Sequence, residues 1–204
     1  MPEPIEDAAI TCLRFQFIGV IEDLKNQPYK WGGDDPLQGF DCSGMVIEGL
    51  KSVGLIGESD DYSANGLLLY FRDDNQSPMM DDPYMGCLIF FLNSTLKAIH
   101  IGVALDSDFM IHAGGGGRPR FSLYEAIHYS PFLLEFYSSY SPDDLKDLLQ
   151  RDIFLQMINQ QLYLQQAARQ NAYIKTRQIK SYCKFREKAY GNTTVFLDPF
   201  IKTD

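Results

Sequence analysis

The sequence contains no apolar run that approaches 18 residues, so no segment is predicted to span a membrane. Its first seven residues are acidic and have neither the basic stretch nor the small-residue cleavage site of a secretory signal peptide. We therefore expect a protein that is made in the cytoplasm. If it acts outside the cell, the export route is not encoded in this sequence.

Cationic residues are scarce, which argues against broad nucleic-acid binding, because phosphate contacts need clustered Lys and Arg. The 204 residues include 18 Lys+Arg and 27 Asp+Glu, a net charge of −9. Residues 1–141 hold 8 basic and 20 acidic residues, whereas residues 142–204 hold 10 and 7. The basic excess lies in the run Arg169–Lys188, for which the simplest interpretation is a solvated helix face that docks on the acidic part of the chain.

Cysteine and histidine are also scarce, with four and three residues. If Cys42 is a nucleophile it must stay unpaired, and an odd number of cysteines is then left to pair. Cys12 and Cys87 lie in apolar segments, where a reduced cysteine behaves as a small core side chain. We expect all four cysteines to be thiols.

Apolar periodicity and turn residues predict helices first and a sheet afterwards, which favours an α+β fold. Helices are expected over residues 5–25, from Asp41 to a stop at Gly54 or Gly57, and over 64–70. Strands are expected over residues 86–93, 98–106, 109–113 and 132–137.

The residue pattern changes after residue 141, and this change divides the chain into a domain over 1–141 and a helical extension over 142–204. The run Ser141-Pro142-Asp143-Asp144 is a strong helix start, with an N-cap serine, proline at the first position and acids in the first turn. The helix is expected to run into the 170s, and towards Tyr190 with a break. It is rich in Gln and then basic.

Cys42 is predicted to lie in the first turn of a helix capped by Asp41. The unpaired amides and partial positive charge there favour the reactive thiolate, and the same amides can stabilise an oxyanion. Ser43 and Gly44 keep the approach uncrowded. On these residues alone, a capped helix that buries a cysteine is the better interpretation.

Two histidines are predicted to meet on neighbouring strands. Alternation places His100 on one face of its strand with Gly102, and a turn over 106–108 leads into the strand of His112. A hairpin centred on residue 106 would place His100 directly opposite His112. Two adjacent imidazoles are an unusual way to build a core, but they suit a base and its orienting partner.

Other interpretations of these residues remain open. Cys42, His100 and His112 could bind zinc, although no second thiolate or carboxylate pair is near in sequence. The two histidines could also be structural, and His128 is expected at the surface. The glycine run 114–117 has no Lys-Ser/Thr ending and opens no helix, so it is not a phosphate loop. We expect its backbone to approach substrate, with Arg118 and Arg120 near the mouth of the site.

The chain resembles the NlpC/P60 family of papain-like cysteine peptidases over roughly residues 10–137. The pieces that carry the resemblance occur in the family's order, and they are Pro28-Tyr29-Lys30-Trp31-Gly32-Gly33, Phe40-Asp41-Cys42-Ser43-Gly44, Gly86-Cys87-Leu88-Ile89-Phe90-Phe91, His100-Ile101-Gly102-Val103 and Ile111-His112-Ala113. Cys87 stands where the family commonly has Asp, which we expect to be harmless.

The resemblance implies a Cys-His-His site. Cys42 would be the nucleophile, His100 the general base and His112 the orienting residue, and the Tyr29 hydroxyl would assist the oxyanion site. The substrate would be bound by Trp31, Asp41, Ser43, Gly114 and Gly115. No metal or other cofactor is implied.

Family members usually cut bacterial stem peptides of peptidoglycan, often between γ-linked D-glutamate and a diamino acid. Peptidoglycan is therefore the expected partner, reached by a phage, prophage or otherwise exported protein. A competing interpretation is a phage tail or assembly protein, which would associate with itself or with a virion through the C-terminal helix, the peptidase domain being accessory or inactive. A Cys-His acyltransferase or amidase on another substrate would need the same residues.

Overall fold

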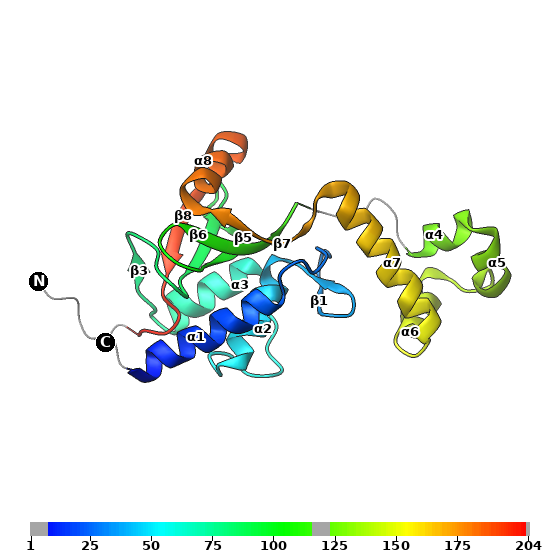
Figure 1. Cartoon of the computed structure of the whole chain (residues 1–204), viewed down its shortest axis with the longest axis horizontal. Coiled ribbons are helices and arrows are strands. Elements are labelled where there is room, and N and C mark those ends of the chain that lie inside the picture. The colour runs from blue at the N-terminus through cyan, green and yellow to red at the C-terminus, as the bar shows by residue number, and fades with distance from the viewer. Residues whose placement is uncertain (1–7, 116–122, 203–204) are drawn as a thin grey trace, which may run out of the picture.

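A six-stranded antiparallel sheet forms the centre of this computed structural model, which describes residues 8–115 and 123–202 (Figure 1). The order of the strands is β3-β8-β4-β5-β6-β7. Their bounds are Met79–Met80 for β3, Leu88–Leu92 for β4, Ala98–Ala104 for β5, Phe109–Gly114 for β6, Tyr173–Gln178 for β7 and Thr193–Leu197 for β8. The mixture of helices with an antiparallel sheet confirms the predicted α+β class.

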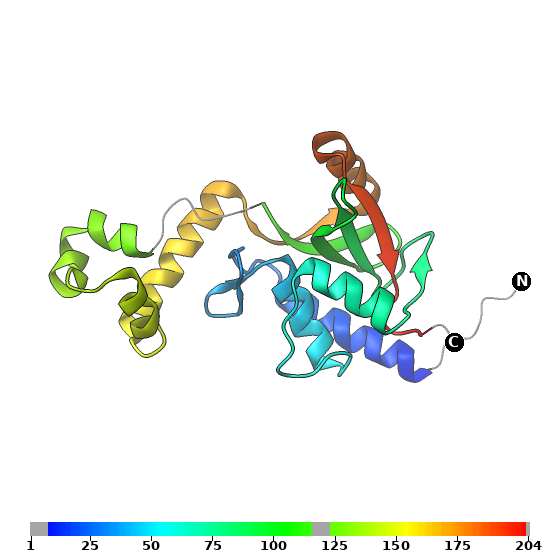
Figure 2. The same cartoon turned by 180° about the vertical axis from the view of Figure 1, so that it is seen from behind.

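Helices cover both faces of the sheet. Helices α1 (Ala8–Asp23), α2 (Cys42–Ser52) and α3 (Ala64–Leu69) lie on one face, and α8 (Ile179–Tyr190) lies on the other (Figures 1 and 2). A π-helical turn, η1 (Tyr70–Asp74), continues α3. The short hairpin of β1 (Asp34–Asp35) and β2 (Gly39–Phe40) leads directly into α2.

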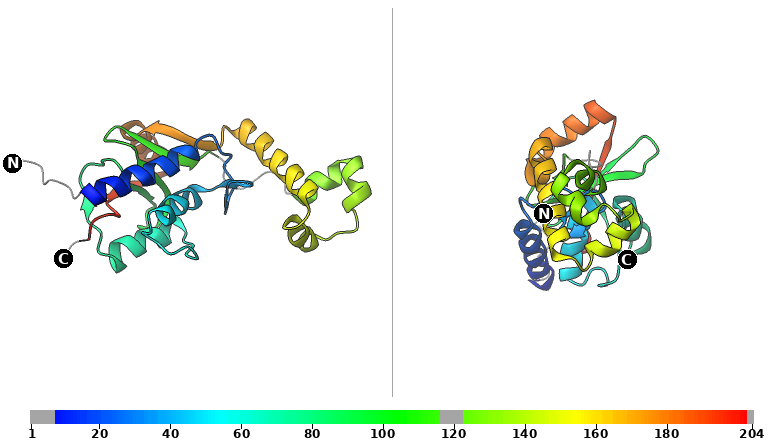
Figure 3. Two further views of the ribbon diagram at one scale, coloured as in Figure 1. Left: turned by 60° about the horizontal axis from the view of Figure 1, so that its bottom comes forward. Right: turned by 90° about the vertical axis from the view of Figure 1, so that its right-hand side faces the viewer.

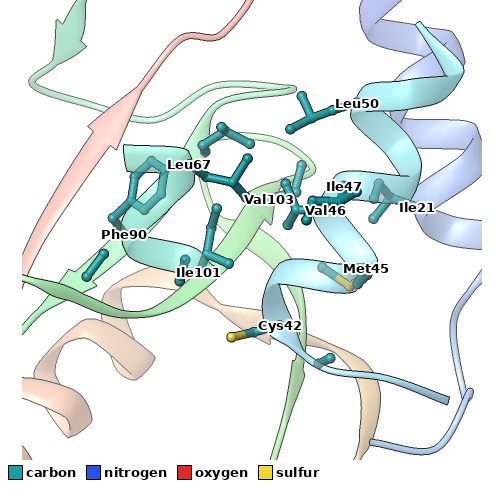
Figure 4. Packing of buried hydrophobic residues seen from close by; sticks show 14 of the residues in the cluster. Ile21, Cys42, Met45, Val46, Ile47, Leu50, Leu67, Phe90, Ile101 and Val103 are labelled. Carbon is teal, nitrogen blue, oxygen red and sulfur yellow. The ribbon is translucent and has the colours of Figure 1, made fainter. Parts of the chain in front are cut away.

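The main core lies between the sheet and α1–α3. Ile101 and Val103 of β5 pack against Val46 and Leu50 of α2 there (Figure 4). The intervening residues of the strands face α8 in a smaller cluster that includes Phe91. Because both faces are covered, all five residues of β4 are buried, and the strand is continuously apolar rather than alternating.

A buried ion pair joins the first helix to the end of the last strand. Arg14 Nη2 lies 2.6 Å from Asp198 Oδ2, and the two side chains are 1% and 0% exposed. The Tyr84 hydroxyl donates to the same carboxylate oxygen. The Arg14 guanidinium also lies 4.7 Å from the centre of the Phe200 ring. Removal of either charge would leave the other unpaired in the core. This network therefore fixes the C-terminal segment against α1.

Most of the expected elements of the first 115 residues are confirmed. Helices α1, α2 and α3 and strands β4, β5 and β6 lie where the periodicity predicts them. Asp41 is the N-cap of α2, as predicted. The four cysteines are all unpaired, as predicted. Cys12, however, is exposed rather than part of the core.

The strand predicted over 132–137 is wrong, because these residues form helix α5 (Pro131–Tyr137). The Ser130 side chain accepts a hydrogen bond from the Leu133 N–H, and Pro131 occupies the first turn. Both features start a helix, and a short apolar run cannot be distinguished from a buried strand by periodicity alone.

The helix predicted after Ser141 begins as expected, with a capping box between Ser141 and Asp144. It is divided into α6 (Pro142–Leu149) and α7 (Ile153–Gln170). The prediction of further helix over 173–178 is wrong, because these residues form β7 at the sheet edge. Residues 193–197 form β8, which pairs with β3 and β4.

The sheet therefore contains strands from both sides of the predicted boundary at 141/142. The prediction of an entirely helical extension is wrong for β7 and β8. Between β6 and β7 the chain forms an arm of four helices, α4 (Leu123–Tyr129), α5, α6 and α7, which projects from the sheet (Figure 3). Division of the chain at residue 141 as a functional boundary stays a prediction. Within the described residues, none of the helices has the length and apolar character needed to cross a bilayer.

Candidate active site

Cys42 is the first residue of α2, and Asp41 holds the turn before it. Asp41 Oδ1 accepts hydrogen bonds from the N–H groups of Ser43 (2.9 Å) and Gly44 (2.8 Å), and Oδ2 accepts one from the Gly32 N–H (3.0 Å). The amides of Ser43 and Gly44 are therefore already engaged. The role of the Cys42 N–H as an oxyanion donor stays a prediction.

The Cys42 thiol is buried, with 9% of the residue exposed. Burial raises its pKa to about 11, and the negative charge of Asp41 acts in the same direction. Hydrogen bonds from backbone N–H groups, including that of Ile101, lower the pKa but do not offset the burial. Burial therefore favours the neutral thiol at rest, although the N–H groups of Cys42 and Ser43 at the helix start lower the pKa in the predicted direction. The bond to Ile101 places the sulfur beside the residue that follows His100.

The two predicted histidines do meet, although in a different register. Val103 pairs with Ile111 and Ala104 with Met110, so the hairpin is centred on Ser107 rather than on residue 106. Asp106 Oδ1 accepts from the N–H groups of Asp108 and Phe109, both at 2.7 Å, and this turn sets the register. The difference displaces the strand partner by two residues, so His100 and His112 are diagonal neighbours that remain on one face.

The imidazoles of His100 and His112 form a direct hydrogen bond, with 2.9 Å between His100 Nε2 and His112 Nδ1. The residues are 7% and 1% exposed. Burial, followed by the neighbouring His112, lowers the pKa of His100 well below its usual value. Burial also lowers the pKa of His112 to about 3, with Lys175 and Arg177 contributing. Both rings are therefore neutral at physiological pH.

Two glycines make room for this pair. A Cβ atom on Gly102 would lie 3.2 Å from His112 Cβ, and one on Gly114 would lie 2.6 Å from His112 Cε1. Any side chain at Gly114 would displace the imidazole ring. Gly114 was expected to contact substrate, and it also makes room for the His112 ring.

A cleft of about 350 Å³ opens beside His100. Its lining residues come from three parts of the chain, and they are Tyr29, Trp31, Ile99, His100, Gly114, Gly115, Tyr182, Arg186 and Tyr190. Of the five residues expected to bind substrate, Trp31, Gly114 and Gly115 line this cleft. Asp41 and Ser43 instead bond to each other in the helix cap, with 2.9 Å between Ser43 Oγ and Asp41 Oδ1.

Tyr29 lies near Cys42, as the motif implied. Burial raises the pKa of its hydroxyl, and the neighbouring charges of Cys42 and Asp41 add to the effect. The hydroxyl is therefore protonated and can donate a hydrogen bond. By contrast, His128 is exposed on α4, where its Nδ1 lies 2.8 Å from the Tyr124 carbonyl oxygen, as expected for a surface residue. Gly116, Gly117, Arg118 and Arg120 lie outside the described residues.

Sequence reasoning missed the contribution of helix α8. Its Tyr182 ring centroid lies 4.7 Å from that of His112 and 6.2 Å from that of His100. Tyr182, Arg186 and Tyr190 are spaced by four residues, so they share one helix face. The spacing is visible in the sequence, but the basic residues around it favour a solvated helix face. Among the described residues, no three His, Cys, Asp or Glu side chains are arranged to hold a metal ion.

The NlpC/P60 family model matches residues 26–136, just over half of the chain. The chain belongs to the NlpC/P60 family. This match contains Cys42, His100 and His112, and it ends before α8. The NlpC/P60 resemblance seen in the motifs is thereby confirmed.

Named relatives align with part of the NlpC/P60 chain. It is 30% identical over 94 residues to the probable peptidoglycan endopeptidase LytE of Bacillus subtilis (strain 168), across 46% of this chain and 25% of that protein. The chain thus spans about a quarter of the length of this relative.

Two similar structures are an NLP/P60-family protein from Staphylococcus aureus, described as similar to a lipoprotein, and the peptidoglycan hydrolase RipB from Mycobacterium tuberculosis. The first is 25% identical with a TM-score of 0.42, across 56% of this chain and 37% of that chain. The second is 22% identical with a TM-score of 0.43, across 54% of this chain and 57% of that chain.

Proposed function

We propose that this protein is a cysteine peptidase that hydrolyses an amide bond in the stem peptides of peptidoglycan. Two observations carry the proposal: a buried thiol bonded to the N–H of Ile101, the residue that follows His100, and a direct hydrogen bond between the imidazoles of His100 and His112. Membership of the NlpC/P60 family and the likeness to an endopeptidase of the cell wall support the substrate class.

The hydrogen bond between the imidazoles determines which nitrogen of His100 acts. Because Nε2 is bonded to His112, Nδ1 is the nitrogen that exchanges a proton with Cys42. His100 then carries its resting proton on Nε2 and donates it to His112 Nδ1. His112 accepts this bond and fixes the ring, which is an orienting role. Its own proton lies on Nε2, which has no hydrogen-bond partner among the described residues.

The reaction we propose has two steps. His100 Nδ1 takes the proton of Cys42, the thiolate attacks the carbonyl carbon, and the Cys42 N–H and the Tyr29 hydroxyl donate to the oxyanion. The carbon–nitrogen bond breaks, and the amine leaves with the proton from His100. Water then gives a proton to His100 and attacks the thioester, which releases the acid and restores the thiol.

The bond we propose joins γ-linked D-glutamate to a diamino acid. To test it, purified sacculi are incubated with the protein and the new termini are identified by mass spectrometry. We expect a new γ-D-glutamyl carboxylate and a new amino terminus on the diamino acid. Cleavage at another amide would correct the bond. Acylated products without hydrolysis would favour the acyltransferase alternative, and intact sacculi would reject the proposal.

We propose a second role, self-association, for the helical arm. The observation that favours it is exposed apolar surface on α5 and α7, where Phe132 is 58%, Phe136 54% and Met157 62% exposed. Large apolar side chains grouped at a surface are typical of interaction sites. Light scattering of the purified protein should give at least twice the monomer mass of 23.3 kDa. Phe136→Asp should restore the monomer, and a monomeric parent protein would reject this role.

A further inference from the structure

Helix α8 supplies one wall of the cleft with a cation. Arg186 is half-buried there between Tyr182 and Tyr190, on the sheet face that carries both histidines. Its charge reaches the catalytic pair, since it helps to lower the pKa of both His100 and His112. A fixed positive charge beside two neutral imidazoles serves no step of the mechanism above.

The guanidinium of Arg186 is held in position from several sides. Its Nε donates to Asn192 Oδ1 at 2.9 Å. Asn192 is buried and donates in turn to the Leu92 carbonyl oxygen at 3.1 Å, which anchors it to the end of β4. The guanidinium carbon lies 5.3 Å from the ring centre of Phe91 and 5.0 Å from that of Tyr190. Little side-chain entropy is therefore left to lose when a ligand binds.

No acid neutralises this cation within the described part of the chain. The ion pairs found there are Arg14–Asp198, Arg72–Asp73 and Lys146–Asp143. Of the five N–H donors of a guanidinium, one bonds to Asn192 and another to the Tyr182 oxygen. The remaining donors suit a carboxylate, which guanidinium groups bind in a bidentate geometry.

We propose that Arg186 binds a carboxylate of the substrate and so makes the cleft selective for acidic peptides. The inference rests on the proposed function and deepens it. In a γ-linked D-glutamate the α-carboxylate stays ionised. Its carbon is separated by three carbon–carbon bonds from the methylene carbon next to the scissile carbonyl. We assign this carboxylate to Arg186. Lys175 and Arg177 of the neighbouring strand β7 add positive charge near His112. In a chain of net charge −9, this basic region is local to the cleft.

The test compares two synthetic stem peptides that differ only at the α-carbon of D-glutamate, one with a carboxylate and one with a neutral carboxamide. We expect the parent enzyme to prefer the acid form in kcat/KM by about 10- to 100-fold, the range for a charge-assisted hydrogen-bond pair. Arg186→Gln should lose this preference by slowing only the acid form. Arg186→Lys should keep part of the preference, since the charge remains without the planar fork.

Lys184→Gln is the matched control, because it removes one exposed cation from the same helix outside the cleft and should leave the preference unchanged. Binding of both peptides to the Cys42→Ala protein, measured by calorimetry, should show the same preference without turnover. If Arg186→Gln lowers kcat/KM equally for both peptides, or if the parent enzyme does not distinguish them, the carboxylate site is rejected while the peptidase function stands. If neither peptide is cleaved or bound, the proposed function fails and the assignment of Arg186 fails with it.

Discussion

Cys42→Ala is expected to lower hydrolysis of stem peptides by at least about 10⁴-fold, because no other group can form the thioester. The rest of the site would remain in place. Only one sulfur atom is removed, and its buried position lies beside the first turn of α2, so the free energy of unfolding should change by only about 1 kcal/mol. The measurement is kcat/KM on a purified stem peptide, accompanied by thermal unfolding of both proteins.

Two other thiols provide controls for this result. Cys12 is exposed on α1, and Cys183 is half-buried on α8. Cys12→Ala and Cys183→Ala should retain the parent rate. Alkylation of the whole protein cannot replace these variants, because the exposed Cys12 is more accessible than the buried Cys42. Parent activity in Cys42→Ala would show that the nucleophile has been assigned to the wrong residue.

The protonation state of the site explains how a thiol with a raised pKa can still react. Thiolate and imidazolium are both disfavoured in the resting site, since burial raises the pKa of Cys42 to about 11 and lowers that of His112 to about 3. In the mechanism that we propose, proton transfer from Cys42 to His100 therefore requires the bound substrate, whose developing oxyanion receives hydrogen bonds. In this mechanism the thiol would stay protonated until a carbonyl is in place.

Local signals predicted the elements that hold Cys42, His100 and His112. The helix start at Asp41 depends on contacts within three residues, and the strands around His100 and His112 depend on apolar alternation. These signals are readable because the interactions are between near neighbours in sequence. The hairpin register was wrong because it depends on the Asp106 side chain, which closes the turn around Ser107.

The C-terminal strands could not be predicted in the same way. Strand β7 pairs with β6 across the whole inserted arm, and β8 pairs with β4 across about half of the chain. Lys175 and Arg177 make the sequence of β7 similar to that of the basic helix that follows it, although Ile174 is fully buried in the sheet. Partner strands this distant leave little trace in local composition. The proposed role of Arg186 could not be predicted for the same reason. It depends on the packing of α8 over the histidines, which are distant in sequence.

The residue that orients the base should matter less than the base itself. His100→Ala removes the proton acceptor and should lower kcat by about 10⁴-fold or more. His112→Ala leaves the proton acceptor His100 in place but no longer orients its ring. We expect kcat to fall by about 10²-fold, the usual order for a supporting hydrogen bond. KM should change little in either variant, because neither ring is the proposed anchor for the substrate. Equal losses would indicate that His112 takes part in proton transfer.

Gly114→Ala separates the orientation of His112 from its presence. The added Cβ would lie 2.7 Å from His112 Nδ1, the atom that bonds to His100, so the ring must move and the 2.9 Å bond is lost. We therefore expect the same loss of kcat, about 10²-fold, as for His112→Ala. Gly19→Ala is the matched control, since a Cβ there meets nothing within 4 Å and should leave kcat unchanged. Parent activity in Gly114→Ala would show that the bond between the histidines is not needed for catalysis.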